Sequence, residues 1–363
     1  MKIGILGTRG IPNRYGGFEQ FAEYLSVELV KRGHEVVVYT SKSHPLKLNS
    51  YKGVSIVRIY DPEDYLSTAG QFIYDFLSIW HSRGQKFDVI LQLGYTSSAI
   101  FYRLHPKGVP VVTNMDGLEW KRSKYSYFVK KFLSLSEKLA VIQSDYLIAD
   151  SVEIGNYIEK KYHKKPTFIP YGATVEQEAN EEVCKEFNLQ KNGYDMLVAR
   201  LEPENNIEMI LDGVVVSKTD RKFLVIGKNE TKYGKFLKNK YENYSNILFI
   251  GGIYDIKKLN SLRFYSNLYF HGHSVGGTNP SLLEAMGSQA FICAHDNPFN
   301  RAVLEENAIY FKNSQDIVGI LQIDKNLYFY FIKNNIQNIN KIYNWKNIVD
   351  SYEDFFKFIL KFK

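Results

Sequence analysis

Cysteine is almost absent from this sequence, which has only 2 cysteines in 363 residues. Cys184 and Cys293 lie far apart and show neither a metal-binding nor a redox spacing, which argues against a disulfide framework and indicates a reducing compartment. No apolar run approaches the length that crosses a bilayer, and the start MKIGILGTRG lacks the basic segment and apolar core of a signal peptide. We therefore expect a cytoplasmic protein.

A concentrated basic stripe is also missing. The net charge of +7 is mild and spread along the chain, which argues against a nucleic-acid partner and suits anionic small molecules or anionic lipid. Aromatic residues are abundant, with 27 Tyr and 24 Phe. This abundance indicates either a sugar-stacking or membrane-facing surface, or a coding bias toward Tyr, Phe, Ile, Asn and Lys.

The sequence does contain two successive series of short apolar runs that alternate with amphipathic stretches. Near-continuous β-branched runs are typical of buried parallel strands, and helical stretches between them indicate right-handed crossovers. The strands expected in the first series are residues 3–6, 36–39, 54–58, 89–93, 111–113 and 146–149, and those in the second are 195–199, 222–226, 247–250, 268–270 and 290–294.

The two series meet at Pro170-Tyr171-Gly172, which has the composition of a linker. A chain of 363 residues is long enough for two domains with separate cores. The sequence therefore predicts an α/β fold of two Rossmann-like, doubly wound domains, residues 1–172 and 173–343, whose ligand loops face a central cleft. We expect the amphipathic segment 344–363 to form a helix that packs back on the first domain.

A basic stretch, residues 121–138, carries six Lys or Arg residues against a single acid, Glu137, and its apolar residues recur at helical spacing. Such a helix either lies on an anionic membrane surface or is an ordinary helix with a buried stripe and solvated lysines. The residues alone leave both alternatives open.

The loop after the first strand is rich in glycine, with Gly7-Thr8-Arg9-Gly10 followed by Gly16 and Gly17. Glycines let backbone amides approach a bound group, and the helix N-terminus adds partial positive charge, so this loop favours a phosphate. The spacing is not the dinucleotide fingerprint, and no acid follows the second strand in the expected way. We therefore do not expect an NAD site.

A second glycine-rich loop, residues 271–279, leads from a strand into a helix that begins near Pro280. Proline is well placed at a helix start, and the exposed amides of Thr278, Asn279 and Ser281 would point at an anion. Glu284 lies one turn into the helix, where its carboxylate can accept hydrogen bonds from ribose hydroxyls. The simpler alternative is an acid that complements the helix dipole, but the density of small and polar residues in the loop favours a binding role.

These residues carry a resemblance. The second half resembles the retaining family 4 glycosyltransferases of the GT-B fold, in which a glycine-rich loop and a helix carry a Glu-x7-Glu signature. More narrowly, the chain resembles bacterial rhamnosyltransferases that act on cell-surface polysaccharides. Gly276 stands where the broader family has its first glutamate, and Asn205 stands where an Arg-x4-Lys pair has its lysine. The segments that carry the resemblance are residues 4–19, 114–124, 200–206, 271–286 and 295–301.

The resemblance implies that Arg200 binds the donor diphosphate and stabilises the leaving group with its permanent charge. The alternative for Arg200 is a surface ion pair with Glu202 or Glu204. Because Asn205 replaces the lysine, a second cation is needed, and Lys228 and Arg9 are the candidates. The donor-binding residues expected from both loops and these cations are Gly16, Gly17, Arg9, Lys228, His273, Gly277, Thr278, Asn279 and Ser281.

Asp116 follows a strand of the first domain, where its carboxylate could orient or deprotonate an acceptor hydroxyl. Its alternative is an Asx-turn before Gly117. We take Asp116, Arg200 and Glu284 as the catalytic candidates. Acceptor binding is expected from the same loop, at Glu119, Trp120 and Lys121. For His273, and likewise for His295, a packing or capping role competes with a place in the donor site.

The resemblance therefore implies transfer of a hexose, L-rhamnose from dTDP-rhamnose, with retention, onto a saccharide or lipid-linked saccharide acceptor. For a β-linked donor, retention gives a β-linked product. The Asp-x-Asp metal motif of the other large glycosyltransferase fold is missing, so we expect no metal and no cofactor besides the nucleotide-sugar co-substrate. The alternatives are a nucleotide-sugar epimerase of the same fold and a nucleotide-sugar-binding protein without turnover.

Overall fold

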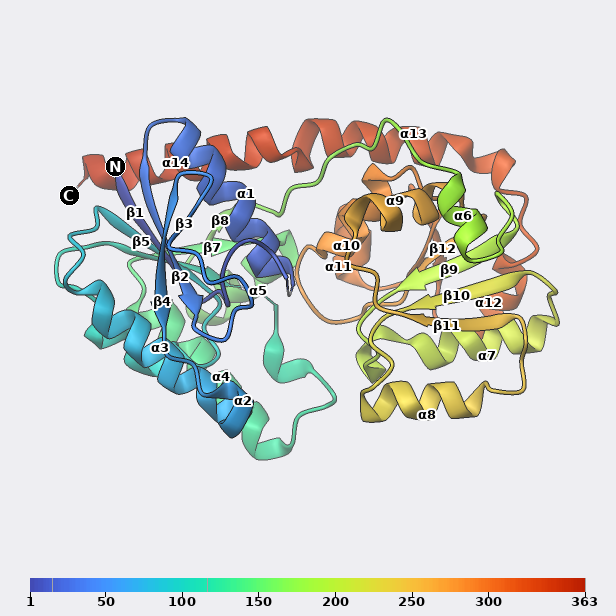
Figure 1. Ribbon diagram of the computed structural model, residues 1–363, viewed down its shortest axis with the longest axis horizontal. Helices are drawn as coiled ribbons and strands as arrows, with labels where there is room; N and C mark the ends of the chain where they lie inside the picture. Colours follow the sequence, from blue (N-terminus) through green and yellow to red (C-terminus); the bar gives the residue numbers. More distant parts are fainter. Residues whose placement is uncertain (15, 116, 363) are drawn as a thin grey trace. The chain divides into compact units, whose positions relative to one another are not determined.

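The computed structural model describes residues 1–14, 16–115 and 117–362, and the chain forms two compact units (Figure 1). The first unit comprises Met1–Lys121, Tyr125–Tyr171 and Trp345–Lys363, and the second comprises Arg122–Lys124 and Gly172–Asn344. The short segment Arg122–Lys124 therefore belongs to the second unit although the residues on both sides of it belong to the first. After the second unit ends at Asn344, the last segment of the chain belongs to the first unit again. Each unit is described by itself below.

The first unit is built on an eight-stranded sheet in the order β3-β4-β2-β1-β5-β6-β7-β8. Neighbouring strands run parallel, except that β3 pairs antiparallel with β4. The strands are β1 (Lys2–Leu6), β2 (Glu35–Ser41), β3 (Ser50–Tyr51), β4 (Val54–Ile59), β5 (Val89–Leu93), β6 (Val111–Met115), β7 (Tyr146–Ala149) and β8 (Thr167–Phe168).

The direction in which strands are added reverses between β1 and β5. Right-handed crossovers then place α1 on one face of the sheet and α3, η1, α4 and α5 on the other, and Figure 1 shows α3 and α4 on the same side. The helices are α1 (Gly17–Lys31), α2 (Glu63–Leu66), α3 (Thr68–Ser82), η1 (Ala99–Leu104), η2 (Glu119–Lys121), α4 (Tyr127–Gln143), α5 (Val152–Tyr162) and α14 (Trp345–Lys361).

The last helix, α14, completes the core of the first unit by packing against α1. Its apolar residues fall on one stripe, and Tyr352 in that stripe is fully buried. The Tyr352 ring lies 5.1 Å from that of Phe21 of α1, and Trp345 stacks on Tyr24 with ring centroids 4.3 Å apart. Aromatic pairs at these separations add to the energy of apolar burial.

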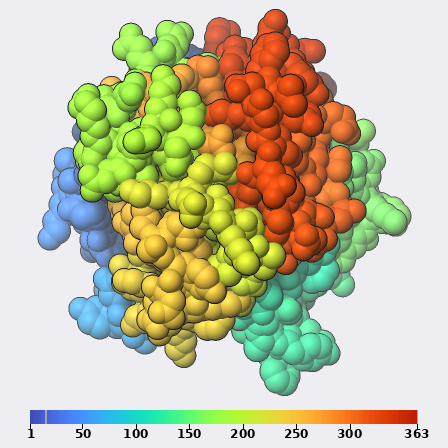
Figure 2. All heavy atoms as spheres, turned by 90° about the vertical axis from the view of Figure 1, so that its right-hand side faces the viewer, coloured from blue at the N-terminus to red at the C-terminus, as the bar shows by residue number. Residues whose placement is uncertain are grey.

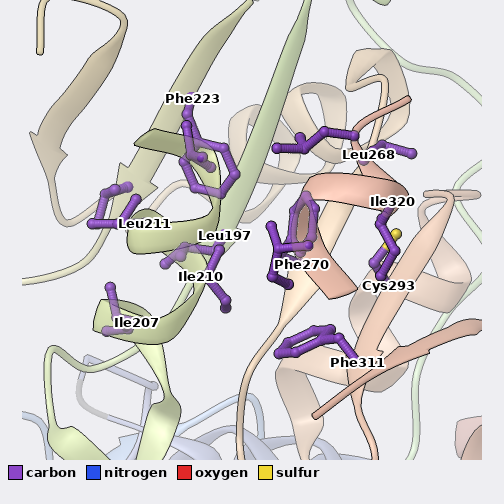
Figure 3. Close-up of a cluster of buried hydrophobic side chains, with 14 of the residues drawn as sticks. Leu197, Ile207, Ile210, Leu211, Phe223, Leu268, Phe270, Cys293, Phe311 and Ile320 are labelled. Carbon is purple, nitrogen blue, oxygen red and sulfur yellow. The ribbon is translucent and has the colours of Figure 1, made fainter. Parts of the chain in front are cut away.

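The second unit has a six-stranded sheet in the order β11-β10-β9-β12-β13-β14, and every neighbouring pair is parallel. Figure 3 shows its core, in which Leu197, Phe223, Phe270 and Phe311 are buried together. The strands are β9 (Tyr194–Val198), β10 (Lys222–Ile226), β11 (Ile247–Gly251), β12 (Tyr269–His271), β13 (Ile292–His295) and β14 (Ile309–Phe311).

Helices surround this second sheet, and α13, in red, lies on the surface of the unit in Figure 2. The helices are α6 (Glu182–Glu186), η3 (Pro203–Asn205), α7 (Ile207–Ser217), α8 (Lys232–Lys240), α9 (Ile256–Tyr265), α10 (Pro280–Gly287), α11 (Pro298–Leu304), α12 (Ser314–Ile320), η4 (Lys325–Tyr328), α13 (Phe329–Asn338) and η5 (Ile339–Tyr343).

The predicted two-domain α/β fold is confirmed, and each predicted strand is present within one or two residues at its ends. Three strands were not predicted: β3, β8 and β14, which are two or three residues long. The expectation of one helix over residues 121–138 is corrected, because α4 begins at Tyr127, and Ser126 before it has an extended backbone. Within the described residues, no helix combines the length and the apolar character needed to cross a membrane.

Candidate functional site

The strand order of the second unit reverses between β9 and β12. In doubly wound sheets, such a reversal leaves a crevice at the C-terminal ends of the strands, and this crevice is where ligands bind. Arg200 follows β9, His273 follows β12, and Lys228 follows the neighbouring strand β10. Three of the predicted donor-site residues therefore lie on loops at the same edge of one sheet.

The Arg200 side chain is exposed at this edge. Among the described residues, Arg200 forms no direct ion pair with Glu202 or Glu204, whose carboxylates pair with Arg122 and Lys124. The charge of Arg200 nevertheless acts on Glu202 and lowers its pKa. Asn205 is 3% exposed, and its Nδ2 donates to the Arg200 carbonyl oxygen at 2.7 Å. Asn205 therefore fixes the backbone of the loop instead of presenting a replacement for the lysine.

Two stacked histidines lie at the end of β12. The rings of His271 and His273 are 4.4 Å apart, with an interplanar angle of 15°. Burial, together with the positive charges of Arg200 and Arg122, lowers the pKa of His273 to about 3, and burial drives the pKa of His271 well below its usual value. Both imidazoles are therefore neutral near pH 7, and the positive charge at this edge comes from arginine and lysine.

Arg122 is a cation that we did not assign to the site from the sequence. It belongs to the short segment Arg122–Lys124, which is part of the second unit. Its Nη1 lies 3.5 Å from a carboxylate oxygen of Glu204, and its charge acts on His273. Although burial tends to raise the pKa of Glu202, the charges of Arg200, Lys124 and Arg122 lower it overall. Arg122 is therefore a second cation whose charge acts, like that of Arg200, on Glu202 and His273.

The glycine-rich loop after β12 has a backbone conformation that favours glycine at position 276. Gly276 has a φ of +138°, a conformation that residues with an L side chain rarely adopt. A glutamate at this position would be strained in the loop as it stands. The next residues lead to α10, and Thr278 among them is buried, whereas Gly277 is half-buried.

The N-terminus of α10 requires a correction to the predicted anion contacts. Asn279 caps the helix, and its Oδ1 accepts the backbone N–H of Ser281 at 2.9 Å. The Ser281 amide is therefore already satisfied and does not point at a ligand as we expected. The Ser281 hydroxyl is also engaged, because it lies 3.0 Å from Nη2 of Arg263 and 3.1 Å from the Tyr269 hydroxyl.

Arg263 is the residue of this site that sequence reasoning missed. Its side chain on α9 is fully buried, and Nη1 lies 2.8 Å from Oε2 of Glu284, whose side chain is 18% exposed. The same Nη1 donates to Oδ1 of Asn260 at 2.9 Å. The guanidinium thus holds the Glu284 carboxylate in a fixed orientation, one turn into α10. No loop motif marks Arg263, which lies inside an ordinary helical stretch.

In the first unit, the glycine-rich loop after β1 is closed by an internal carboxylate. A Cβ on Gly7 would collide with the backbone of Leu93, so only glycine allows this close approach to β5. Oε1 of Glu19 accepts the Arg9 backbone N–H at 2.9 Å and the Thr8 hydroxyl at 3.2 Å. Glu19 therefore already uses one of the loop amides that an anion would otherwise accept.

A pocket of about 520 Å³ opens beside this loop within the first unit. This volume is in the usual range for small-molecule sites. The Arg9 side chain at its wall forms an ion pair with Glu63. The remaining walls come from the loop before α1, the end of β2 and the loop after it, the loop after β4, α2, and the starts of α1 and α3. They include Arg14, Glu19, Ser41, His44, Asp61 and Asp64. The predicted donor residues Gly16 and Gly17 are the N-cap and the first residue of α1, and neither is among the residues that line the pocket.

The predicted acceptor residues Glu119, Trp120 and Lys121 form η2 and do not line this pocket. Nε1 of Trp120 donates to Oε2 of Glu137 at 3.0 Å, and the ammonium groups of Lys121 and Lys161 lie over its ring at 5.6 Å and 5.5 Å. The ring is thus already packed, so stacking on a sugar would have to displace one of these lysines.

The predicted catalytic Asp116 lies outside the described residues. Among the described residues, no group of three or more His, Cys, Asp or Glu side chains is arranged to hold a metal ion. Metal independence of the reaction stays a prediction.

The first half of the chain, residues 1–174, matches the family model of a domain of unknown function, DUF1972. No curated protein matches the sequence significantly. The family match stops just after the linker, so it covers the first unit without α14.

Solved structures match the whole chain in three dimensions. Sucrose-phosphate synthase from Thermosynechococcus elongatus has a TM-score of 0.84 at 15% identity, and the match covers 100% of both chains. HepE from Anabaena, in complex with UDP-glucose, has a TM-score of 0.77 at 13% identity over 98% of this chain and 99% of that one. A glycosyltransferase from Rickettsia africae has a TM-score of 0.73 at 13% identity over 99% and 98%. These likenesses show that the chain has the GT-B fold predicted from its sequence.

Proposed function

We propose that this protein is a glycosyltransferase that moves a hexose from a nucleoside diphosphate to a saccharide acceptor. The observation that carries the proposal is the arrangement of the second unit. Arg200 and His273 follow the two strands where the sheet order reverses, and Glu284, held by Arg263, lies in the helix after the same glycine-rich loop. The GT-B fold and the UDP-glucose in the HepE structure support this assignment.

In this proposal the donor diphosphate binds beside Arg200, with Lys228 and Arg122 as further cations. Thr278 and Asn279 contribute from the glycine-rich loop, and Glu284 accepts hydrogen bonds from the ribose. Arginine suits this role because its charge is permanent and its planar fork matches phosphate oxygens. As the bond between the sugar C1 and the diphosphate oxygen breaks, the electron pair moves onto that oxygen, and these cations stabilise the growing charge.

The acceptor side of the proposal rests on the pocket of the first unit. Its walls carry several carboxylates and two arginines, a combination that suits a neutral sugar with many hydroxyls better than a second anion. The acceptor oxygen forms the new bond to C1, and its proton passes to the departing diphosphate. Asp116 stays a candidate for orienting the acceptor hydroxyl. Retention, independence of metal, and L-rhamnose as the hexose are the finer parts of the proposal, and they rest on the resemblance.

Donor binding is tested by thermal unfolding in the presence of dTDP-rhamnose, UDP-glucose and related nucleotide sugars. A true donor raises the melting temperature, because it binds only the folded state. We expect Arg200→Ala and Glu284→Ala to weaken this shift, since each removes a proposed donor contact. Lys235→Ala, which removes an exposed positive charge on α8, is the matched control and should leave the shift unchanged. An undiminished shift in both site variants would place the donor elsewhere.

Turnover is tested with the best donor and a lipid-linked saccharide acceptor. A glycosylated lipid with the donor's anomeric configuration, formed in the presence of chelator, is the expected product. Conversion of the donor without acceptor would instead indicate an epimerase, and binding without conversion would indicate a binding protein. Loss of turnover on adding chelator would contradict metal independence.

A further inference from the structure

Helix α4 exposes apolar side chains that the core of the first unit does not need. Phe128, Leu135 and Ile142 are 81%, 50% and 57% exposed. They are spaced seven residues apart and therefore form one stripe along the helix. The opposite side of α4 is the buried one, with Leu133 and Ala140 among its residues. Because α4 is held in the first unit by its buried side, the exposed stripe is not needed for packing the helix.

The exposed charges of α4 have one sign. Lys131 and Lys138 are exposed and lie three residues after Phe128 and Leu135, which places them beside the stripe. The single acid of the helix, Glu137, is 1% exposed and points inward. Its carboxylate accepts hydrogen bonds from Trp120, Tyr157, Lys161 and Tyr162 at 2.7–3.0 Å. The outer face of α4 therefore combines apolar side chains with lysines only.

Two neighbouring helices continue this face. Phe72 of α3 packs on Phe132 of α4 with ring centroids 5.6 Å apart, and Phe76 of α3 lies 5.4 Å from Phe101 of η1. Exposed residues of α3 and η1 include Trp80 at 54%, Ile73 at 37% and Ile100 at 40%. The acid of α3, Asp75, is buried, whereas Arg83 and Arg103 are exposed. Figure 1 shows α3 and α4 on the same side of the sheet.

We propose that this α3–η1–α4 surface, defined by Ile73, Trp80, Ile100, Phe128, Leu135 and Ile142 with the surrounding Arg83, Arg103, Lys131 and Lys138, binds an anionic phospholipid bilayer. Apolar side chains of an interfacial helix enter the boundary between head groups and acyl chains, and lysine and arginine reach the lipid phosphates. Anionic lipid adds attraction for each basic residue near the surface. Tryptophan, here Trp80, is a typical interfacial residue because its ring is apolar and its N–H is polar.

A lipid surface fits better than the other partners of a basic face. A nucleic acid would use the basic residues and the aromatic rings, but it offers no partner for the aliphatic Leu135 and Ile142. A second copy of the chain would bring the same lysines against each other, which is unfavourable. The inference is independent of the proposed transfer reaction, because it concerns a different face and needs no donor.

The test is co-sedimentation of the full chain with vesicles of phosphatidylcholine, alone or mixed with phosphatidylglycerol. We expect binding to the mixed vesicles only, and weaker binding at high salt, because the attraction between exposed charges is screened. Phe128→Ser, Leu135→Ser and Ile142→Ser combined should reduce partitioning at least about tenfold, since the inserted apolar area is lost. Val216→Ser with Phe236→Ser is the matched control, because these residues are 58% and 47% exposed on the second unit.

A second variant, Lys131→Glu with Lys138→Glu, changes charge without touching the apolar stripe, and it should abolish the preference for phosphatidylglycerol. Brominated lipid should quench part of the tryptophan fluorescence, and Trp80→Phe should remove that part. Unchanged melting temperatures would show that the variants fold. The proposal is overturned if the protein binds neither vesicle, if the control loses as much binding as the triple variant, or if the stripe variant abolishes only self-association.

Discussion

At the scale of single residues, the pair Arg263–Glu284 carries the sharpest prediction. Breaking a buried ion pair from one side leaves a charge without its partner, at a cost of roughly 3 kcal/mol. We expect Arg263→Ala to lower the free energy of unfolding by about this amount, and to weaken the melting shift produced by a donor. Arg263→Lys keeps the charge but loses the fork that also reaches Asn260 and Ser281, so it should recover only part of both effects.

A double-mutant cycle separates the pair from its surroundings. Arg263→Ala, Glu284→Gln and the double variant are compared by urea unfolding, and the pair should show a coupling of about 1 kcal/mol or more. If the two effects simply add, Glu284 is oriented by other groups, and Arg263 is not its positioning residue.

Asp75 predicts a pH dependence of stability. Ser97 donates to Oδ2 of Asp75 at 2.6 Å, and burial raises the pKa of this carboxyl to about 7, with a further contribution from Asp61. The folded protein therefore keeps the proton between pH 3.8, where the carboxyl ordinarily titrates, and pH 7. Stability is highest on the acid side of this window and falls as the pH rises through it, because ionising the folded form is unfavourable.

Asp75→Asn keeps the shape and the acceptor but removes the titration. Relative to wild type, the variant should gain about 3 kcal/mol of stability between pH 5 and pH 8, because about two pH units separate pH 5 from the folded-state pKa of about 7. Urea unfolding at both pH values measures this difference. Asp220→Asn, at an exposed position, is the control and should show none. An equal response of the two variants would mean that Asp75 is not the group responsible.

At the scale of elements, the contact between α7 and α12 in the second unit depends on a glycine. A Cβ on Gly213 would collide with the Cβ of Ile317 and lie 2.7 Å from the Ser314 carbonyl oxygen. Gly213→Ala should therefore separate the helices and lower the free energy of unfolding by about 1–3 kcal/mol. Gly319→Ala is the matched control on α12, where a Cβ meets nothing within 4 Å. There, alanine should stabilise by roughly 0.5–1 kcal/mol. Thermal and urea unfolding of both variants test the opposite signs.

The elements also show what a sequence can and cannot predict. Long strands such as β1 and β5 were predictable because both of their faces are buried, which requires a continuous apolar run. Edge strands of two or three residues, such as β8 and β14, are too short for their residues to be distinguished by pattern from other apolar stretches. At the site, loop residues such as Arg200 were recognisable from their place after a strand. Arg263 was not, because its role depends on α9 meeting α10 in space.

The walls of the pocket in the first unit illustrate the same limit. Asp61 and His44 come from loops after two different strands, and neither loop has a pattern of its own. They were found only through the sheet order, which places β2 beside β1 and β4 beside β2. Sequence reasoning placed the acceptor at η2 instead, because Trp120 stands in a recognisable motif. Its bond to Glu137 depends on the packing of α4 and cannot be seen in the motif.

At the scale of the whole molecule, the two units differ in whether their cores come from one continuous stretch of sequence. The first unit needs α14 from the far end of the chain, whereas the core of the second unit is drawn from a continuous stretch. Proteins of several domains often depart from a single cooperative transition. We therefore expect two calorimetric transitions, one for each core, and a donor that binds the second unit should raise only one of them.

Tyr352 tests whether the two units unfold separately, because it lies at the far end of the sequence, on α14, and is buried in the core of the first unit. It is fully buried against Phe21 and Phe356, and its hydroxyl accepts from Nδ2 of Asn114 at 3.3 Å. Removing a buried aromatic side chain costs about 3–5 kcal/mol, so Tyr352→Ala should lower one transition by many degrees. The donor-responsive transition should not move. Phe358→Ala, at a residue of the same helix that is 54% exposed, should change neither. If Tyr352→Ala lowered both transitions together, the two units would unfold as one, and the return of α14 would stabilise the whole chain.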